Sequence, residues 1–215
     1  MHADLQAFAA GLGLPVSPQQ LTQLKTYAGC VWKKKEMLNL TSVADLNEMY
    51  VRHLADGIVA AAKIAAMCRV KQLTAPEVAD VGAGAGYIGF VLAILLPHAH
   101  ITAIESLEKR CAFMNWAVLQ TGLKNLRIQK ARLGQGTQKT FDFVTERAMG
   151  QLPDILEICM NVVKENGVFI AFQGEHPQTQ DCKLPAQTVL LGVEPYSLPC
   201  PDNKKRHLAL FGKCI

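Results

Sequence analysis

A glycine-rich segment directly after a short apolar run constrains the fold of this chain more than any other feature. Residues 78–89 read VADVGAGAGYIG, and an apolar helical pattern follows over residues 87–96. Alternating glycines permit the tight turn that joins a buried strand to the N-terminus of a helix, where backbone amides can meet a nucleotide. The segment therefore predicts the first strand–helix unit of a doubly wound α/β sheet.

The remainder of the chain after residue 72 continues this alternation of short apolar runs and longer amphipathic ones. We expect strands at 78–81, 101–104, 126–129, 141–145 and 168–172, with helices at 87–96, 107–121 and 152–164. Glu165, Asn166 and Gly167 are expected to stop the last helix, and 131–140 is too polar and Gly-rich for a full helix. Strands at 187–193 and 207–211 are expected to close as a hairpin. The result is a seven-stranded, mostly parallel sheet with helices on both faces.

The first 72 residues lack a strand candidate and are predicted to be helical. Apolar residues recur at helical spacing around Leu24, after a Ser17-Pro18 start signal. A second helix begins near Asp45 and carries His53 and Asp56. We expect residues 1–72 to form a helical extension packed on a core domain of residues 73–215, as one compact unit.

The glycines alone do not select the nucleotide. Gly84, Gly86 and Gly89 fit the dinucleotide pattern, whereas Asp80 with Gly82, Gly84 and Gly86 fits the pattern of S-adenosylmethionine sites. A carboxylate at the strand end would repel a pyrophosphate, but it can pair with the ammonium group of the methionine moiety. The charges, together with the predicted C-terminal hairpin, favour S-adenosylmethionine and the Rossmann-like class I methyltransferase fold.

Glu105 ends the second predicted strand, where its two oxygens can accept hydrogen bonds from ribose hydroxyls. Both nucleotide classes use such an acid, so Glu105 indicates a nucleoside without choosing one. In the alternative interpretation, Asp80 only caps the following helix and the glycines only permit close packing.

Composition excludes several other classes of protein. The apolar run at 87–96 is about half of the ~20 residues that a membrane span needs, and the N-terminus lacks the features of a secretory signal. Seven scattered cysteines without a C-x-x-C pair indicate neither a disulfide framework nor a metal site. We therefore expect a cytoplasmic protein without a metal. A net charge of +4 is too mild to identify a nucleic-acid binder, although its basic clusters could contact phosphates or simply be solvated.

Two segments of the N-terminal region carry a more specific resemblance. Residues 39–43 read NLTSV and residues 51–56 read VRHLAD. Together with the glycine segment, the run ESLEKR from residue 105, Arg147-Ala148 and Arg206-His207, they resemble the bacterial 16S rRNA guanine-N7 methyltransferases. This is the RsmG family, also called glucose-inhibited division protein B (GidB), and the resemblance covers roughly residues 20–213.

The resemblance implies methyl transfer from S-adenosylmethionine to N7 of a guanine in the decoding-region loop of 16S rRNA, with the rRNA or the small ribosomal subunit as partner and a monomeric enzyme. Guanine N7 carries a lone pair and no proton, so the reaction needs orientation of the reactants rather than a general base. The chain also lacks the Asn/Asp-Pro-Pro-aromatic motif of many amine methylases. Cys200, far past the fourth strand, is more consistent with a structural role than with a nucleophile.

Residue roles follow from the resemblance. Gly82, Gly84 and Gly86 shape the methionine pocket beside Asp80, Glu105 holds the ribose, and Ala131 and Arg132 border the adenine. Arg147 guides the guanine or its phosphate and also borders the cofactor; alternatively, it only pairs with Glu146 or another carboxylate. His53 and Asp56 close over the pocket as catalytic residues or form a satisfied, partly buried pair. Arg132, Lys204, Lys205 and Arg206 contact RNA, although Arg206 could lie in a solvated turn.

The chain departs from the family pattern at several positions. Ile88 and Val91 replace two prolines, Gly57 replaces a serine, Glu146 replaces a serine, and Gln173 replaces a lysine. These departures lie where the base and the rRNA should bind. They leave open a methyltransferase for another RNA or a small molecule, and a catalytically silent RNA- or nucleoside-binding module.

Overall fold

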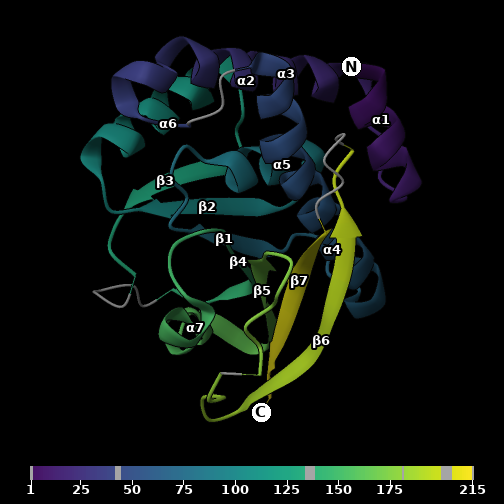
Figure 1. Ribbon diagram of the computed structural model, residues 1–215, viewed down its shortest axis with the longest axis vertical. Coiled ribbons are helices and arrows are strands. Elements are labelled where there is room, and N and C mark those ends of the chain that lie inside the picture. The colour runs from purple at the N-terminus through teal and green to yellow at the C-terminus, as the bar shows by residue number, and fades with distance from the viewer. Residues whose placement is uncertain (1, 42–44, 134–138, 181, 200–204, 215) are drawn as a thin grey trace.

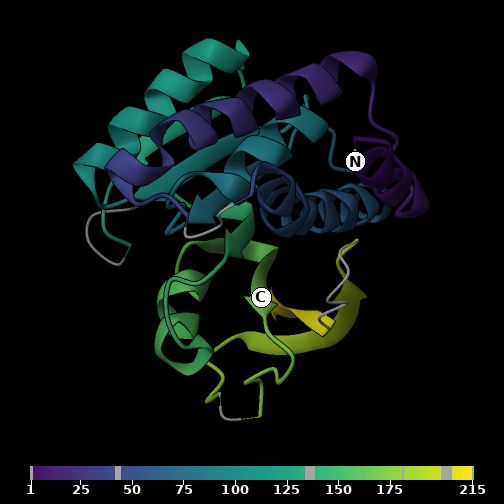
Figure 2. The same ribbon diagram turned by 45° about the horizontal axis from the view of Figure 1, so that its top comes forward.

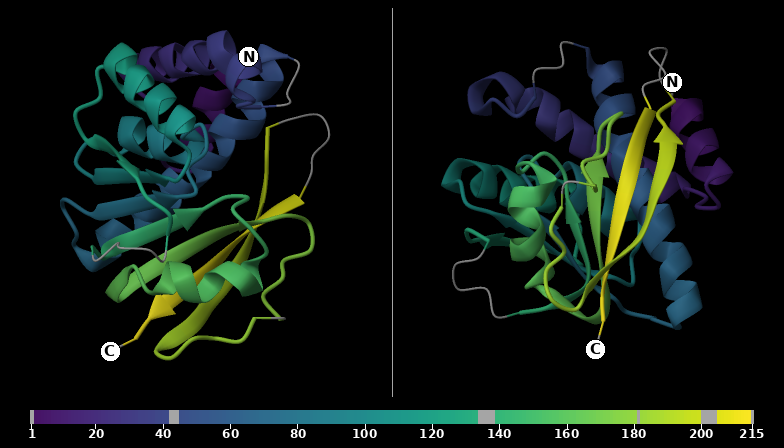
Figure 3. Two further views of the ribbon diagram at one scale, coloured as in Figure 1. Left: turned by 90° about the vertical axis from the view of Figure 1, so that its left-hand side faces the viewer. Right: turned by 60° about the horizontal axis from the view of Figure 1, so that its bottom comes forward.

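A single mixed sheet organises the computed structural model, which describes residues 2–41, 45–133, 139–180, 182–199 and 205–214. Its strands are β1 (Glu77–Val81), β2 (His100–Glu105), β3 (Leu126–Lys130), β4 (Phe141–Glu146), β5 (Val163–Gln173), β6 (Thr188–Ser197) and β7 (Lys205–Lys213). The spatial order is β3-β2-β1-β4-β5-β7-β6 (Figure 1). Strands β1 to β5 are parallel, and β7 pairs antiparallel with β5 and β6. The predicted sheet and its hairpin are confirmed (Figure 3).

The helices before and between the strands also follow the prediction. They are α1 (His2–Gly11), α2 (Pro18–Leu38), α3 (Leu46–Met49), the π-helical segment η1 (Tyr50–Leu54), α4 (Ala55–Lys71), α5 (Tyr87–Leu95), α6 (Glu108–Thr121) and α7 (Leu152–Met160). Ser17 and Gln20 form a reciprocal capping box at the start of α2. Asp45 accepts a hydrogen bond from the Glu48 amide and so caps α3.

Each face of the sheet has its own hydrophobic core. Strand residues such as Val78 and Ile170 pack with α2, α4, α5 and α6 on one face. Their sequence neighbours, such as Ala79 and Phe169, pack with α7 on the other face, because successive residues of a strand point to opposite sides. Figure 2 shows α7 apart from the other helices. The helices of residues 2–71 therefore share a core with the sheet.

One contact ties the N-terminal helices directly to the glycine turn. Tyr27 of α2 is fully buried, and its ring stacks on Phe90 of α5 with centroids 4.2 Å apart. Its hydroxyl donates a 2.8 Å hydrogen bond to the carbonyl of Ala85, within the turn. Helix α2 thus supports the backbone that the sequence predicts to bind a nucleotide.

The predicted end of the helix at 152–164 is wrong. The observed helix, α7, ends at Met160, so Glu165-Asn166-Gly167 do not terminate it. These three residues form a bulge inside β5, since Val163 pairs with Phe141 and Val168 pairs with Phe143. The β-branched residues at 162–163 favour extended backbone, and Asn166 adopts a left-handed φ of 59°. Gly167 fits because a Cβ there would lie 2.8 Å from the Lys164 carbonyl oxygen.

The sheet order determines where a ligand can bind. From β1 the chain proceeds to β2 and β3 on one side and then returns to β4 on the other. In open α/β sheets, such a switch of direction leaves a crevice at the carboxyl ends of the two central strands. Asp80 of β1, Glu105 of β2 and Glu146 of β4 all lie near these ends.

Candidate active site

Three adjoining cavities lie along the carboxyl edge of the sheet. The Glu105 cavity, of about 500 Å³, is lined by Gly82, Ile104, Glu105, Ser106, Leu107, Arg110, Ala131, Arg132, Leu133, Ala148, Met149 and Ile158. The Arg147 cavity, of about 410 Å³, includes Leu40, His53, Asp80, Gly84, Tyr87 and Arg147. The Tyr196 cavity, of about 360 Å³, includes Phe172, Gln173, Tyr196 and Lys205. Gly82 and Ala148 line both of the first two cavities, and Arg147 and Arg206 line both of the last two.

The glycine turn separates the first two cavities. Gly82, Gly84 and Gly86 have φ values of 62°, 61° and 86°, a left-handed conformation that side chains disfavour. Gly82 and Gly84 line the Arg147 cavity. Gly86 instead packs below the turn, where a Cβ would lie 2.7 Å from the Phe90 ring. All three residues are therefore needed for the shape of the turn.

Asp80 is almost completely buried at the end of β1. Its Oδ2 accepts a 2.8 Å hydrogen bond from the Gly89 amide, and its Oδ1 accepts one of 3.2 Å from the Thr145 hydroxyl. Burial raises the pKa of Asp80 to about 6, although these hydrogen bonds oppose the shift. The residue also lines the Arg147 cavity. Asp80 thus braces the first turn of α5 and contributes to the cavity wall.

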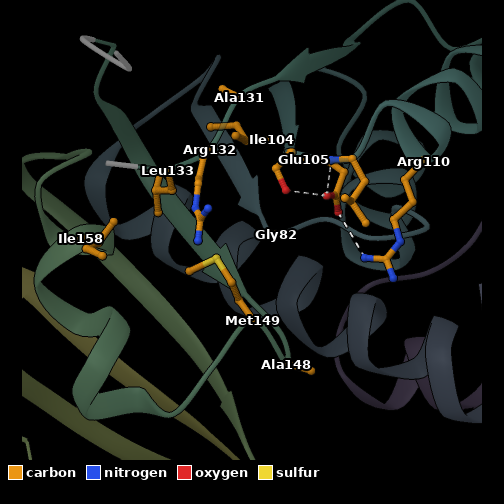
Figure 4. Close-up of a pocket in the computed structure, with 12 residues that line it drawn as sticks. Gly82, Ile104, Glu105, Arg110, Ala131, Arg132, Leu133, Ala148, Met149 and Ile158 are labelled. Atoms are coloured by element: carbon orange, nitrogen blue, oxygen red, sulfur yellow. Dashed lines mark hydrogen bonds and ion pairs between the residues drawn. The ribbon is translucent and has the colours of Figure 1, made fainter. Parts of the chain in front are cut away.

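Glu105 lies at the end of β2 with its carboxylate among backbone amides. Oε2 accepts a 2.9 Å hydrogen bond from Gly84 of the turn, and Oε1 accepts one of 2.9 Å from Leu107. Arg110 approaches Oε2 at 3.6 Å from the first turn of α6 (Figure 4). The structure therefore brings the second predicted acid to the glycine turn.

The far wall of the Glu105 cavity comes from the end of β3. The Ala131 amide donates a 3.0 Å hydrogen bond to the Glu105 carbonyl, and Ala131 and Arg132 line the cavity. Leu133, Met149 and Ile158 add an apolar surface (Figure 4). A carboxylate on one side and an apolar wall on the other suit a nucleoside, whose ribose is polar and whose base is flat.

Asp56 connects the elements around the Arg147 cavity. This fully buried carboxylate accepts hydrogen bonds from Arg147 at 2.8 Å, from Tyr196 at 2.8 Å and from Arg206. The three donors come from the segment after β4, from β6 and from β7. Two guanidinium groups compensate the buried charge, so the cluster fixes the position of Arg147.

His53 holds the other edge of the same guanidinium. Nη2 of Arg147 lies 3.2 Å from Nδ1 of His53, and Nε2 of His53 lies 3.0 Å from the Thr41 hydroxyl. Burial, reinforced by Arg147, lowers the pKa of His53 to about 3, so the ring is neutral at physiological pH. Because a guanidinium only donates, Nδ1 accepts and the ring proton resides on Nε2. His53 and Asp56 are thus joined through Arg147.

The Tyr87 ring lies against both His53 and Arg147. It stacks on His53 with centroids 4.1 Å apart, and the Arg147 guanidinium carbon lies 5.1 Å from its centroid. Burial raises the pKa of Tyr87 to about 12, so the ring remains neutral. The planar guanidinium of Arg147 is therefore oriented by an aromatic face, a carboxylate and an imidazole.

The predicted RNA-contacting residues have different surroundings. Arg132 and Lys205 are exposed, at the Glu105 and Tyr196 cavities respectively. Arg206 pairs with Asp56 instead of lying in a solvated turn. Lys204 lies outside the described residues. The carboxylate that pairs with Arg147 is Asp56 and not Glu146. Glu146 is buried, accepts a hydrogen bond from the Met149 amide, and has its pKa raised to about 7 by burial.

Several residues of the site were not predicted. Tyr196 contacts Asp56 across 140 positions of sequence, so no local pattern could have indicated it. Tyr87 follows the last glycine of the turn, and this position could have suggested a role beside the cavity. Arg110 lies in the run ESLEKR that carries part of the family resemblance, and its place one turn after Glu105 could have suggested a role beside the cavity.

The family model described as rRNA small subunit methyltransferase G (GidB) matches residues 20–209. The chain belongs to this family. Similar family members include the ribosomal RNA small subunit methyltransferase G of Leptothrix cholodnii, 32% identical over 94% of this chain and 91% of that protein. The protein of the same name from Herminiimonas arsenicoxydans is 34% identical over 97% and 94%, respectively. The predicted RsmG membership is confirmed.

Solved structures agree with the fold expected for the family. TrmN from Thermus thermophilus superposes with a TM-score of 0.57 at 19% identity, over 73% of this chain and 48% of that one. An O-methyltransferase structure from Klebsiella pneumoniae gives 0.58 at 12% identity, over 94% and 92%. These similarities support the class I methyltransferase fold.

Two kinds of feature are absent from the described residues. No helix among them combines the length and the apolar character that crossing a membrane requires. In the same part of the chain, no three His, Cys, Asp or Glu side chains gather in a way that could hold a metal ion.

Proposed function

We propose that this protein methylates N7 of a guanine in the decoding-region loop of 16S rRNA, with S-adenosylmethionine as methyl donor. Its family consists of rRNA small subunit methyltransferases. The observation that carries the proposal is that the Glu105 cavity, suited to a nucleoside, directly adjoins the Arg147 cavity, in which the Arg147 guanidinium is held in a fixed orientation.

The residues fit S-adenosylmethionine. The Glu105 carboxylate would accept from the ribose hydroxyls, while Ala131 and Met149 would border the adenine. Asp80 would face the ammonium group, and the amides of the glycine turn would face the carboxylate. When bound, the cofactor supplies an electrophilic methyl group on a sulfonium. All the residues named for these roles line one of the two cavities.

Arg147 would orient the guanine. Its guanidinium has five N–H donors, and the hydrogen bonds to Asp56 and His53 occupy one on each terminal nitrogen. The remaining N–H groups can bind the guanine O6 or a neighbouring phosphate. N7 has no proton to lose, and neutral His53, which accepts from Arg147, would act in positioning. Catalysis would then rest on holding the two reactants in line.

Exposed cations near the cavities would contact the rRNA backbone. Arg132 lies beside the Glu105 cavity and Lys205 beside the Tyr196 cavity, and Lys204 and Arg206 are expected to assist. Arg206 retains partial exposure while it pairs with Asp56. We also propose a cytoplasmic monomer in which the extension of residues 1–72 and the domain of residues 73–215 act as one unit.

A methyltransferase for another RNA is the second candidate. Gln173, which replaces the family lysine, lies in the Tyr196 cavity and donates to the carbonyl of Phe172. The loss of this positive charge alters the wall that would face RNA. A different target nucleotide would leave the Glu105 cavity unchanged.

Transfer of labelled methyl groups to purified subunits tests the proposal. Small subunits lacking the modification should become labelled, large subunits should not, and nucleoside analysis should identify 7-methylguanosine. Arg147→Lys should reduce transfer at least tenfold, because lysine cannot reproduce the fork of contacts. Arg69→Lys, an exposed arginine at the end of α4, is the matched control. Label in another nucleoside, or on large subunits, would contradict the proposal.

A further inference from the structure

A fourth hollow lies outside the cavities described above. A surface groove of about 460 Å³ runs between the end of α2 and the start of α6, two helices that pack side by side (Figures 1 and 2). Its floor is apolar and includes Met37, Phe113 and Trp116, and Lys34 and Lys109 stand on its two sides. None of its lining residues is acidic.

The apolar floor of this groove is accessible. Met37 is 68% exposed, and Trp116 is half-buried in the wall formed by α6. The Lys34 ammonium lies 5.8 Å from the Trp116 ring centroid, at the distance of a cation–π contact. An aromatic ring flanked by cations is the combination that binds single-stranded nucleic acid, since bases stack on the ring and phosphates pair with the cations.

The groove lies close to the proposed active site along the chain. Lys109 lines the groove, and the next residue, Arg110, lines both the Glu105 and Arg147 cavities. On the opposite wall, Leu38 lines the groove and Leu40 lines the Arg147 cavity. Asn39 between them turns the chain with a left-handed φ of 50°. Because residues one or two positions apart line the groove and the Arg147 cavity, a polymer with one nucleotide in that cavity could place a neighbouring nucleotide at the groove.

We propose that this groove binds single-stranded RNA adjoining the target guanine. One base stacks on Trp116, while Lys34 and Lys109 contact the phosphates on either side. This inference rests on the proposed function, because it takes the substrate to be RNA. The two cations would suit RNA or an acidic peptide alike, and the aromatic floor favours RNA. A base can stack on Trp116 when the Lys34 side chain turns from the ring to a phosphate.

Binding of an unmodified 16S rRNA transcript at several salt concentrations tests the proposal. The double variant Lys34→Gln/Lys109→Gln should bind at least tenfold more weakly at low salt. Its plot of log affinity against log salt should be shallower by about 1.4, since each phosphate contact on a single strand contributes about 0.7. Trp116→Leu should weaken binding about tenfold without changing this slope. Affinity for S-adenosylmethionine should remain within twofold in both variants.

The control replaces two exposed cations at the opposite edge of the sheet, Arg69→Gln and Lys124→Gln. If wild-type protein methylates small subunits but the groove variants bind rRNA no more weakly than this control, the groove inference is wrong and the proposed function stands. If wild-type protein transfers no methyl group to rRNA or subunits, both fail. Self-association of wild-type protein that the groove variants lose would assign the groove to a second copy of the chain and overturn the inference.

Discussion

At the scale of single residues, the site depends on two buried acids with different tasks. Asp56 holds two guanidinium groups and a tyrosine hydroxyl in place, so its charge is compensated within the protein. Glu105 is bound mainly to backbone amides, and these bonds orient its carboxylate toward the cavity. The first acid is thus a structural junction and the second is available to a ligand.

The role of Glu105 can be tested by removing its charge while keeping its shape. Glu105→Gln should weaken binding of S-adenosylmethionine by about 10- to 100-fold, since a hydrogen bond to a charged group contributes roughly 1.5–3 kcal/mol. Calorimetric titration measures this loss. Glu108→Gln, three residues later and paired with Lys130 on the surface, should bind normally. Equal affinities of the two variants would show that Glu105 does not hold the cofactor.

The neutral state of His53 predicts a pH-dependent contribution to stability. Burial lowers its pKa from 6.5 to about 3 in the folded protein. The contribution is therefore complete above pH 6.5 and is lost as the pH falls toward 3, because the unfolded chain then binds the extra proton. In urea unfolding, the stability advantage of wild type over His53→Asn should be larger at pH 7.5 than at pH 5. The comparison between variants cancels the opposite trends of Asp80 and Glu146, whose pKa values are raised. An advantage that does not change with pH would contradict the neutral assignment.

At the scale of elements, the crossing of α4 and α5 explains two departures from the family pattern. Gly57 in α4 lies directly against Val91 in α5, and a Cβ at position 57 would be 2.6 Å from the Val91 Cβ. The serine and proline usual at these positions are absent together, and in this chain glycine makes room for valine. The close approach keeps η1 and His53 near the glycine turn.

Two glycine-to-alanine substitutions in helices should therefore have opposite effects. Gly57→Ala should destabilise the protein by about 1–3 kcal/mol, because the methyl group overpacks the crossing. Gly29→Ala in α2 meets no atom within 4 Å and should stabilise it by about 1 kcal/mol through helix propensity. Chemical unfolding at one pH measures both changes. A stabilising Gly57→Ala would show that α4 and α5 are packed less closely than described.

Elements with a strong periodic pattern were predicted well, and one boundary was not. The helix at α5 and the strands around it follow from apolar runs between turn residues. The end of α7 was missed because Glu165-Asn166-Gly167 is a typical helix stop, yet the same residues suit a bulge in β5. Local sequence does not distinguish these structures; the pairing of β5 with β4 decides it.

At the scale of the whole molecule, the sheet topology assembles a site from distant residues. Asp80 and Glu105 were predicted because each ends a strand next to the glycine turn. The contacts of Asp56 with Tyr196 and Arg206 were not predictable, since they depend on the antiparallel hairpin of β6 and β7 returning to α4. Local patterns thus indicate the residues that we propose for the cofactor, whereas the contacts that orient Arg147 depend on the fold.

The most direct test of the central claim is to map the site of methylation. Small subunits lacking the modification are treated with enzyme and S-adenosylmethionine, and the RNA is then cleaved with borohydride and aniline at N7-methylguanine. We expect one new cleavage in the decoding-region loop, present with wild type and absent with Asp80→Ala. Cofactor binding without any cleavage in this loop would contradict the account and assign the methyl group to another acceptor.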